Sequence, residues 1–258
     1  MRSELTGVRA HLFDLDGVLT STAEVHAAAW REMFDAFLAA RGERPFDPAV
    51  DYPRYLDGRL RADGTRAFLA SRGITLPDGE PDDPPDRETV QGLGNRKNEL
   101  VLAALRSGRL DAYPGAVRFL DEVRGAPCAV VSSSTNCRPV LESIGLVDRM
   151  DVVVDGLVAH VEGLAGKPAP DMFVHAARKL GVEPHEAAVY EDALSGVAAG
   201  HAGGFAVVVG VDRAHQRQAL LDVGATLVVD DLGELAGDGS GDRAGPSDGT
   251  DTGNGVTG

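Results

Sequence analysis

The chain has 258 residues, of which 43% are hydrophobic, and its 25 basic and 40 acidic side chains give a formal net charge of −15. At about 100 to 200 residues per domain, this length allows one large domain or two smaller ones, and we expect two. The negative charge argues against nucleic acid or an anionic membrane as a partner, since both require basic surface.

The sequence contains no feature that indicates export or membrane insertion. It has no apolar segment of the signal-peptide type at its start and no run of 18 apolar residues. The two cysteines, Cys128 and Cys137, are typical of a protein in a reducing compartment. We therefore expect a cytoplasmic protein that does not bind membranes, and we expect a monomer.

The first apolar segment, residues 8–13, ends in a pair of acidic residues. If it is a strand, its alternation sends Asp14 and Asp16 to the same side, and Gly17 breaks the chain directly afterward. Two adjacent carboxylates stay ionised only where a cation or a fixed positive group compensates them. A divalent metal would do so. The alternative is a solvated strand end followed by a turn.

The next 90 residues or so contain helical patterns and no convincing strand. The patterns cover residues 23–40, the stretch after Asp63, and residues 95–105. In the first of them, apolar side chains recur at helical spacing, which predicts a helix with one buried face: Trp30, Phe34, Phe37 and Leu38. The acidic, proline-rich residues 78–86 are interpreted as a solvated loop. We predict an all-helical domain over residues 23–110.

From residue 113 onward, strand and helix patterns alternate, which predicts a parallel sheet covered by helices. The expected strands span residues 128–131, 151–154, 187–190, 205–211 and 226–229. The expected helices span residues 116–124, 138–144, 171–180, 195–202 and 214–223. The strand at residues 8–13 needs partners, so the helical domain must be inserted into one doubly wound α/β sheet domain formed by residues 1–22 and 111–236.

The last segment, residues 237–258, differs in composition from the rest of the chain. Glycine makes up 8 of its 22 residues, and almost none of the others is apolar. Such a segment cannot bury enough apolar surface to offset the entropy lost on ordering. We expect a disordered tail.

Four strand ends of the predicted sheet carry polar residues, and in an open α/β sheet the binding site forms beyond the carboxyl ends of the strands. In chain order these are Asp14 and Asp16, the run from Ser132 to Asn136, Lys167 in a loop stiffened by prolines, and Glu191 with Asp192. Each has an ordinary alternative. Hydroxyls and acids often cap helices, and a lysine before a proline-started helix is often solvated.

Together these residues predict a pocket for Mg²⁺ and phosphate. Mg²⁺ prefers oxygen ligands and binds through one or two carboxylates plus substrate phosphate and water. Phosphoryl transfer depends above all on charge neutralisation and in-line positioning. Asp14 could attack phosphorus to form an aspartyl phosphate, and Asp16, on the same side, could pass a proton to the leaving or attacking oxygen.

Four motifs in this order resemble those of the haloacid dehalogenase superfamily, and the resemblance spans nearly residues 8–232. They are Asp14-Leu15-Asp16-Gly17-Val18, Ser132 to Ser134, Lys167-Pro168-Ala169-Pro170-Asp171, and Glu191-Asp192-Ala193-Leu194-Ser195-Gly196. Three further segments are similar to its β-phosphoglucomutase branch: residues 20–26, residues 94–98, and Tyr113-Pro114-Gly115. The resemblance implies a Rossmann-like core with a helical cap inserted after the first strand, Mg²⁺ as cofactor, and a small phosphorylated sugar as substrate.

The resemblance also implies roles for individual residues. Asp14 would be the nucleophile and a metal ligand, and Asp16 the general acid and base whose backbone carbonyl also binds the metal. Glu191 and Asp192 would complete the metal site. The transferring phosphoryl group would be held by Ser132, Ser133 and Lys167. From the cap, the sugar would be faced by His26 and Lys97, Thr22 would belong to the hinge, and the second phosphate would be held by Arg61, with Ser134 and Asn136 assisting.

One departure from the branch concerns that second phosphate. Ser134-Thr135-Asn136 stands where the branch often has Ser-Lys-Asn, so one positive charge is missing. Arg59 could compensate for it, and is an alternative to Arg61 as the phosphate ligand.

The leading function is interconversion of β-glucose 1-phosphate and glucose 6-phosphate through a bisphosphate. A phosphatase, in which water attacks the aspartyl phosphate, is the alternative with the same core residues. A receiver-type phosphoacceptor module would be smaller and uncapped.

Overall fold

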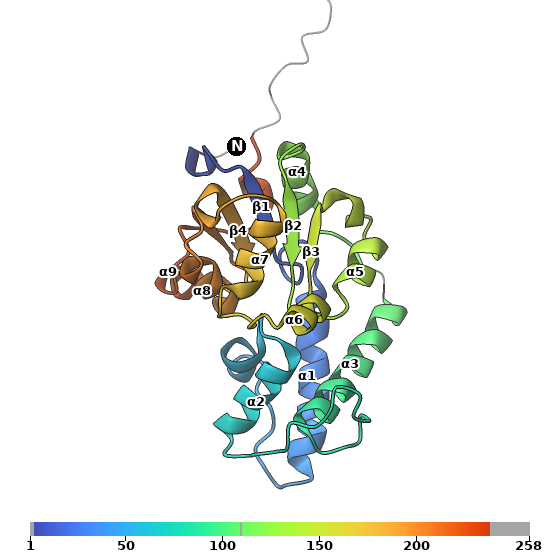
Figure 1. Cartoon of the computed structure of the whole chain (residues 1–258). Coiled ribbons are helices and arrows are strands. Elements are labelled where there is room, and N and C mark those ends of the chain that lie inside the picture. Colours follow the sequence, from blue (N-terminus) through green and yellow to red (C-terminus); the bar gives the residue numbers. More distant parts are fainter. Residues whose placement is uncertain (1–2, 109, 238–258) are drawn as a thin grey trace, which may run out of the picture.

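A computed structural model describes residues 3–108 and 110–237, and the expected tail lies, apart from its first residue, outside this range. At its centre is a six-stranded parallel sheet with the order β3-β2-β1-β4-β5-β6 (Figure 1). The strands are β1 (Ala10–Phe13), β2 (Cys128–Val131), β3 (Val152–Val154), β4 (Ala187–Glu191), β5 (Val207–Val211) and β6 (Leu227–Val229). The predicted α/β fold with a doubly wound parallel sheet is therefore confirmed.

Both faces of the sheet are buried. Successive residues of each strand point to opposite faces, and helices cover each face. Phe13 and Tyr190 belong to one core cluster, whereas Leu12 and Val189 belong to the other. The first layer is completed by α4 (Pro114–Glu122), α5 (Cys137–Ser143) and the short η5 (Leu232–Glu234). The second is completed by α6 (Gly156–Glu162), α7 (Asp171–Lys179), α8 (Leu194–Ala202) and α9 (Arg217–Asp222).

A helical insertion, which we define as residues 22–108, lies between β1 and β2 in the chain and at one end of the sheet (Figure 1). It contains α1 (Thr22–Ala39), the π-helix η2 (Tyr52–Leu56), α2 (Arg61–Ser71) and α3 (Val90–Ser107). It has a core of its own, in which the Phe34 ring lies 5.3 Å from that of Trp30 and 4.1 Å from that of Phe68, between centroids. The apolar face predicted for the first helix is buried.

Two of the differences between the predicted and the observed helices have clear local reasons. The third predicted insertion helix begins at Val90, five residues early, because Thr89 caps it by accepting a hydrogen bond from the Gly92 amide at 3.0 Å. Helix α6 was not among the expected helices. Asp155 caps it by accepting hydrogen bonds from two of its amides, and Gly163, with φ of 65°, ends it.

The remaining short elements are the 3-10 turns η1 (Ser3–Leu5), η3 (Val147–Arg149) and η4 (Pro184–Glu186). Both cysteines are free and buried. Among the helices of residues 3–108 and 110–237, none combines the length and the apolar character needed to span a bilayer.

Candidate active site

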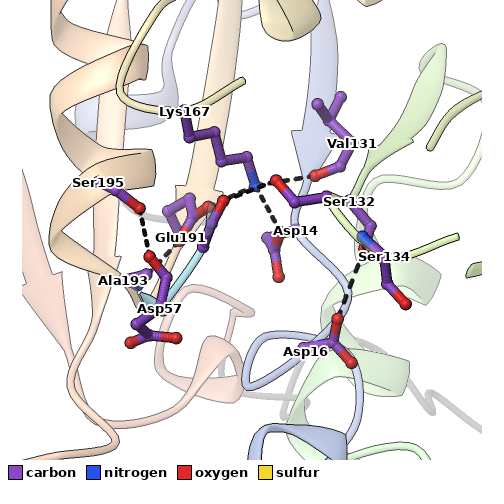
Figure 2. A network of polar contacts seen from close by, with 12 residues as sticks. Asp14, Asp16, Asp57, Val131, Ser132, Ser134, Lys167, Glu191, Ala193 and Ser195 are labelled. Carbon is purple, nitrogen blue, oxygen red and sulfur yellow. Dashed lines mark hydrogen bonds and ion pairs between the residues drawn. The ribbon is translucent and has the colours of Figure 1, made fainter. Parts of the chain in front are cut away.

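Lys167 lies at the floor of the candidate site with its side chain fully buried. Its ammonium donates to Asp14 Oδ1 at 2.5 Å, to Glu191 Oε1 at 2.6 Å and to the Val131 carbonyl at 3.0 Å (Figure 2). These acceptors stand at the carboxyl ends of β1, β4 and β2, which are neighbours in the sheet. All three donors of the ammonium are therefore used, and the lysine ties three strand ends together.

The charges on this floor do not balance, since one ammonium faces two carboxylates. Burial raises the pKa of Asp14 well above its usual range; Lys167 opposes this shift, while Glu191 and Asp16 add to it. For Lys167, burial favours a lower pKa, but the two carboxylates outweigh it and raise the pKa above its ordinary value. Lys167 therefore stays protonated, and the excess negative charge favours binding of a further cation.

Asp16 is held from the side of the helical insertion. Thr22 Oγ1 donates a hydrogen bond to Asp16 Oδ1, and His26 Nε2 faces the same oxygen at 3.7 Å. Lys97 Nζ in turn lies 2.9 Å from His26 Nδ1. Burial and the neighbouring Lys97 lower the pKa of His26 to about 4, so its ring is neutral at pH 7. A neutral ring that accepts from Lys97 at Nδ1 carries its proton on Nε2, on the side of Asp16.

The hydroxyl-rich run after β2 makes most of its hydrogen bonds within the protein. Ser132 Oγ accepts from the Ser134 amide at 3.1 Å and lies 3.5 Å from Asp16 Oδ2. Ser133 Oγ donates to the Gly58 carbonyl of the insertion at 2.6 Å. Asn136 Nδ2 donates to Asn98 Oδ1 at 2.9 Å. The run thus links the sheet to the helical insertion, and its contacts with phosphate remain a prediction.

The four predicted metal ligands are not equivalent in the structure. Glu191 uses one carboxylate oxygen for Lys167 and the other for the Ala193 amide at 2.8 Å. Within the described residues, no three His, Cys, Asp or Glu side chains form a ready metal-binding group. Asp14 and Asp192 both line the cavity above the floor. Two carboxylates suit Mg²⁺, which keeps several waters and takes further oxygens from a substrate phosphate. The residues present fit this ion.

Asp192 lies directly against the turn that follows Asp16. A Cβ at Gly17 would lie 1.9 Å from Asp192 Oδ2, and the φ of Gly17 is 90°. Only glycine satisfies both demands. Burial raises the pKa of Asp192 well above its usual range, and Asp57 and Glu191 raise it further. The motif that contains Asp14 and Asp16 therefore lies directly against Asp192, and the three carboxyl groups gather on one side of the cavity.

The cavity itself lies between the strand ends and the helical insertion and holds about 600 Å³ of space, part of it open to solvent. Eight predicted residues line it: Asp14, Asp16, His26, Arg61, Lys97, Ser133, Ser134 and Asp192. Thr22, Ser132, Asn136, Lys167 and Glu191 lie outside this lining. The alternative candidate Arg59 also lines it.

The cavity wall formed by the helical insertion, here called the insertion wall, carries the basic side chains of Arg59, Arg61 and Lys97. Burial lowers the pKa of Arg61 and lowers that of Lys97 to about 7. Arg61 passes close over Gly94, where an added Cβ would lie 3.2 Å from its side chain. No carboxylate of the described residues lies within ion-pair distance of Arg61. An anion in the cavity would supply the missing partner.

Four polar or aromatic lining residues were not predicted as site residues: Trp30, Tyr52, Asp57 and Asn98. Trp30 has the spacing of a core residue, and its ring faces Lys97 Nζ at 5.0 Å. Tyr52 and Asp57 lie around the π-helix, where no apolar periodicity marks the segment. Tyr52 hydrogen-bonds Asp57, and burial raises the pKa of the Asp57 carboxyl to about 7. The Asp57 carbonyl accepts from Ser195 Oγ at 2.6 Å (Figure 2).

Lys167 lies between the acids of neighbouring parallel strands, with the helical insertion above them. This arrangement suits phosphoryl transfer, which depends on charge neutralisation and positioning. The family of haloacid dehalogenase-like hydrolases matches residues 8–204, and the chain belongs to this family. The predicted resemblance is thereby confirmed.

Individual relatives narrow the class. A β-phosphoglucomutase from Mycobacterium bovis is 54% identical over 250 residues, which cover 91% of this chain and 95% of that protein. A β-phosphoglucomutase from Bacillus subtilis is 32% identical, covering 88% of this chain and 92% of that protein. The crystal structure of β-phosphoglucomutase from Clostridium difficile is similar with a TM-score of 0.70 and 25% identity, covering 88% and 93% of the two chains. This chain is an enzyme, a phosphomutase or a phosphatase.

Proposed function

We propose that the enzyme converts β-glucose 1-phosphate into glucose 6-phosphate through an aspartyl phosphate on Asp14, with Mg²⁺ bound. The observation that carries the proposal is the pairing of two walls across one cavity. Asp14, held at 2.5 Å by Lys167, lies on one wall, and Arg61, which has no carboxylate partner among the described residues, lies on the other. A substrate with two phosphates matches this arrangement, and the relatives named β-phosphoglucomutase support it.

Asp14, Asp192 and the backbone carbonyl of Asp16 would hold Mg²⁺. When bound, the ion neutralises charge on the carboxylates and on the transferring phosphoryl group. Lys167 acts from behind the nucleophile: its contact with one oxygen fixes the Asp14 carboxylate and leaves the other oxygen for phosphorus.

In the transfer step, an oxygen of Asp14 forms a bond to phosphorus while the bond from phosphorus to the sugar oxygen breaks. That sugar oxygen takes the proton that Asp16 carries, and Asp16 removes a proton from the attacking hydroxyl in the return step. Thr22 and His26 hold the Asp16 carboxylate for both steps. The helical insertion covers the cavity as a cap and excludes water from the aspartyl phosphate.

The second phosphate would be held by the insertion wall. Arg61 and Arg59 supply the positive charge that is absent at Thr135, and Ser134 adds a hydroxyl. A charge-assisted hydrogen bond is worth about 1.5 to 3 kcal/mol, or roughly 10- to 150-fold in rate. Hydrolysis of the aspartyl phosphate is the second candidate function, favoured by the match to a family of hydrolases.

The test incubates the enzyme and Mg²⁺ with β-glucose 1-phosphate and a trace of glucose 1,6-bisphosphate, and measures glucose 6-phosphate against inorganic phosphate. Glucose 6-phosphate should dominate. Release of phosphate as the main product would instead identify a phosphatase. Asp14→Asn should abolish both products without changing the far-UV circular dichroism, and substantial residual turnover would exclude Asp14 as the nucleophile.

The second phosphate site has a separate test. Arg61→Ala should reduce mutase activity about 10- to 150-fold, by the contact energy given above, while hydrolysis of a small monophosphate changes little. Arg66→Ala is the matched control, because Arg66 lies on the same helix but pairs with Asp63 and Asp78 at the surface. Equal losses of both activities in Arg61→Ala would contradict the site.

A further inference from the structure

The loop after β5, residues 212–216, contacts the backbone of both acidic motifs, although none of the four motifs includes it. Arg213 Nε donates to the Gly17 carbonyl at 2.9 Å. Gln216 Nε2 donates to the Asp192 carbonyl at 3.2 Å. The loop is itself ordered by Asp212, whose Oδ1 accepts from the Gln216 amide at 2.7 Å. One loop therefore holds the residue after Asp16 and the residue that packs against it.

Gly17 is a sensitive point in this arrangement. Its backbone leaves no room for a Cβ beside the Asp192 carboxylate, so a shift of Gly17 changes the distance between Asp16 and Asp192. The Gly17 amide also donates to the Thr20 carbonyl at 2.7 Å, which closes the turn leading into the helical insertion. The Gly17 carbonyl is held from outside this turn by Arg213.

The guanidinium of Arg213 is occupied by contacts within the protein and is not available to bind a ligand. Its guanidinium lies 3.9 Å from the centre of the Tyr113 ring, donates through Nη1 to the Asp230 carbonyl at 3.0 Å, and contacts Asp231 Oδ2 through Nη2 at 3.4 Å. Tyr113 stands where the chain returns from the insertion, with its amide bonded to the Leu19 carbonyl at 2.9 Å. Three nitrogens and one face of the guanidinium are thus occupied, and Arg213 does not line the cavity.

We propose that Arg213 is a positioning residue for the divalent-cation site: it fixes the Gly17 turn, and through it the spacing of Asp14 and Asp16 from Asp192. The proposal rests on the Mg²⁺ site proposed above. The chain passes between the sheet and the insertion at Thr20 and at Tyr113. Arg213 links both points to the core, the first through the Gly17 turn and the second through the Tyr113 ring. Residues behind metal ligands typically contribute 10- to 100-fold to metal affinity.

The experiment compares full-length wild type with Arg213→Ala, Arg213→Lys and Arg217→Ala. Arg217 is a matched control, because it also donates to a backbone carbonyl, that of Val228 in β6 at 2.6 Å, and pairs with Asp230, but has no hydrogen bond to Gly17. Mg²⁺ affinity is measured without substrate from the rise in melting temperature with Mg²⁺ concentration. A kcat and KM series at saturating and limiting Mg²⁺ accompanies it.

Arg213→Ala should weaken Mg²⁺ binding about 10- to 100-fold, with Arg213→Lys intermediate and Arg217→Ala unchanged, even where both alanine variants melt earlier than wild type. At saturating Mg²⁺ much of the kcat should return. Wild-type Mg²⁺ affinity in Arg213→Ala, or an equal loss of affinity in Arg217→Ala, would overturn the positioning role of Arg213 but leave the proposed Mg²⁺ site standing. A wild type that neither binds Mg²⁺ nor requires it for turnover would overturn the proposed metal site and this inference together.

Discussion

Replacing Lys167 by methionine tests how much the positive charge of Lys167 contributes to the stability of the folded protein. Methionine keeps most of the apolar stem but removes the ammonium that lies 2.5 Å from Asp14 and 2.6 Å from Glu191. Two buried carboxylates then remain without a cation, and the folded protein must take up about one proton more than the wild type. Breaking a buried ion pair by removing one partner typically costs about 3 to 5 kcal/mol.

The proton uptake gives an independent magnitude. A carboxyl with an ordinary pKa near 3.9 to 4.3 that is forced to be protonated at pH 7 costs about 4 kcal/mol, at about 1.4 kcal/mol per pH unit. The folded variant binds more protons than its unfolded chain, so its relative stability falls as pH rises. The loss against wild type should therefore shrink from about 4 kcal/mol at pH 7 to about 1 kcal/mol at pH 5.

Urea denaturation followed by far-UV circular dichroism at both pH values measures this difference, in the absence of Mg²⁺. Lys179→Met is the control, because Lys179 is exposed, and it should change stability by about 0.5 kcal/mol or less. Adding Glu191→Gln to Lys167→Met removes the second charge and should restore much of the loss. A Lys167→Met protein within about 1 kcal/mol of wild type at pH 7, or a loss that does not depend on pH, would refute this charge balance.

Two further predictions concern the core and the cap contact. Burial lowers the pKa of His11 to about 4, so the unfolded chain binds its proton first as pH falls. Wild type should therefore lose about 1.6 kcal/mol relative to His11→Gln between pH 6.5 and pH 5. Parallel stability curves for the two proteins would contradict this. Gly58→Ala places a Cβ 2.4 Å from Ser195 Oγ and should lower kcat/KM at least tenfold. Gly73 has a similar φ of 67° with open space around it, so an equal effect of Gly73→Ala would show backbone strain rather than a lost contact with the core.

The sequence predicted the sheet well because its strands are apolar on both faces. Leu12 and Phe13 differ in the layer they enter, yet both must be apolar, and such a segment is recognisable without knowledge of its neighbours. The acids at strand ends were recognisable for a similar reason, since parallel strands bring their carboxyl ends to one edge. Lys167 could be predicted to lie at that edge, but its choice of Asp14 and Glu191 depends on distances that only the folded chain sets.

The insertion wall was harder to predict, because its residues come from segments without a regular pattern. Tyr52 and Asp57 lie around a π-helix with Pro53 at its start, where neither helical nor strand spacing applies. Helix α6 was hidden by Gly156, although Asp155 before it is an ordinary capping residue. The sequence could supply the types of residue in the cavity, whereas their neighbours across the chain depend on tertiary packing.

Trp30 gives the enzyme an intrinsic fluorescence probe. It is the single tryptophan of the chain, and it lines the cavity. Its ring lies 5.3 Å from the Phe34 ring, between centroids, and its centroid lies 5.0 Å from the Lys97 ammonium. Any sugar phosphate that enters the cavity changes the surroundings of this one indole, so emission measures occupancy without an attached label. In Asp14→Asn, where turnover is expected to stop, the same signal would report substrate affinity separately from chemistry.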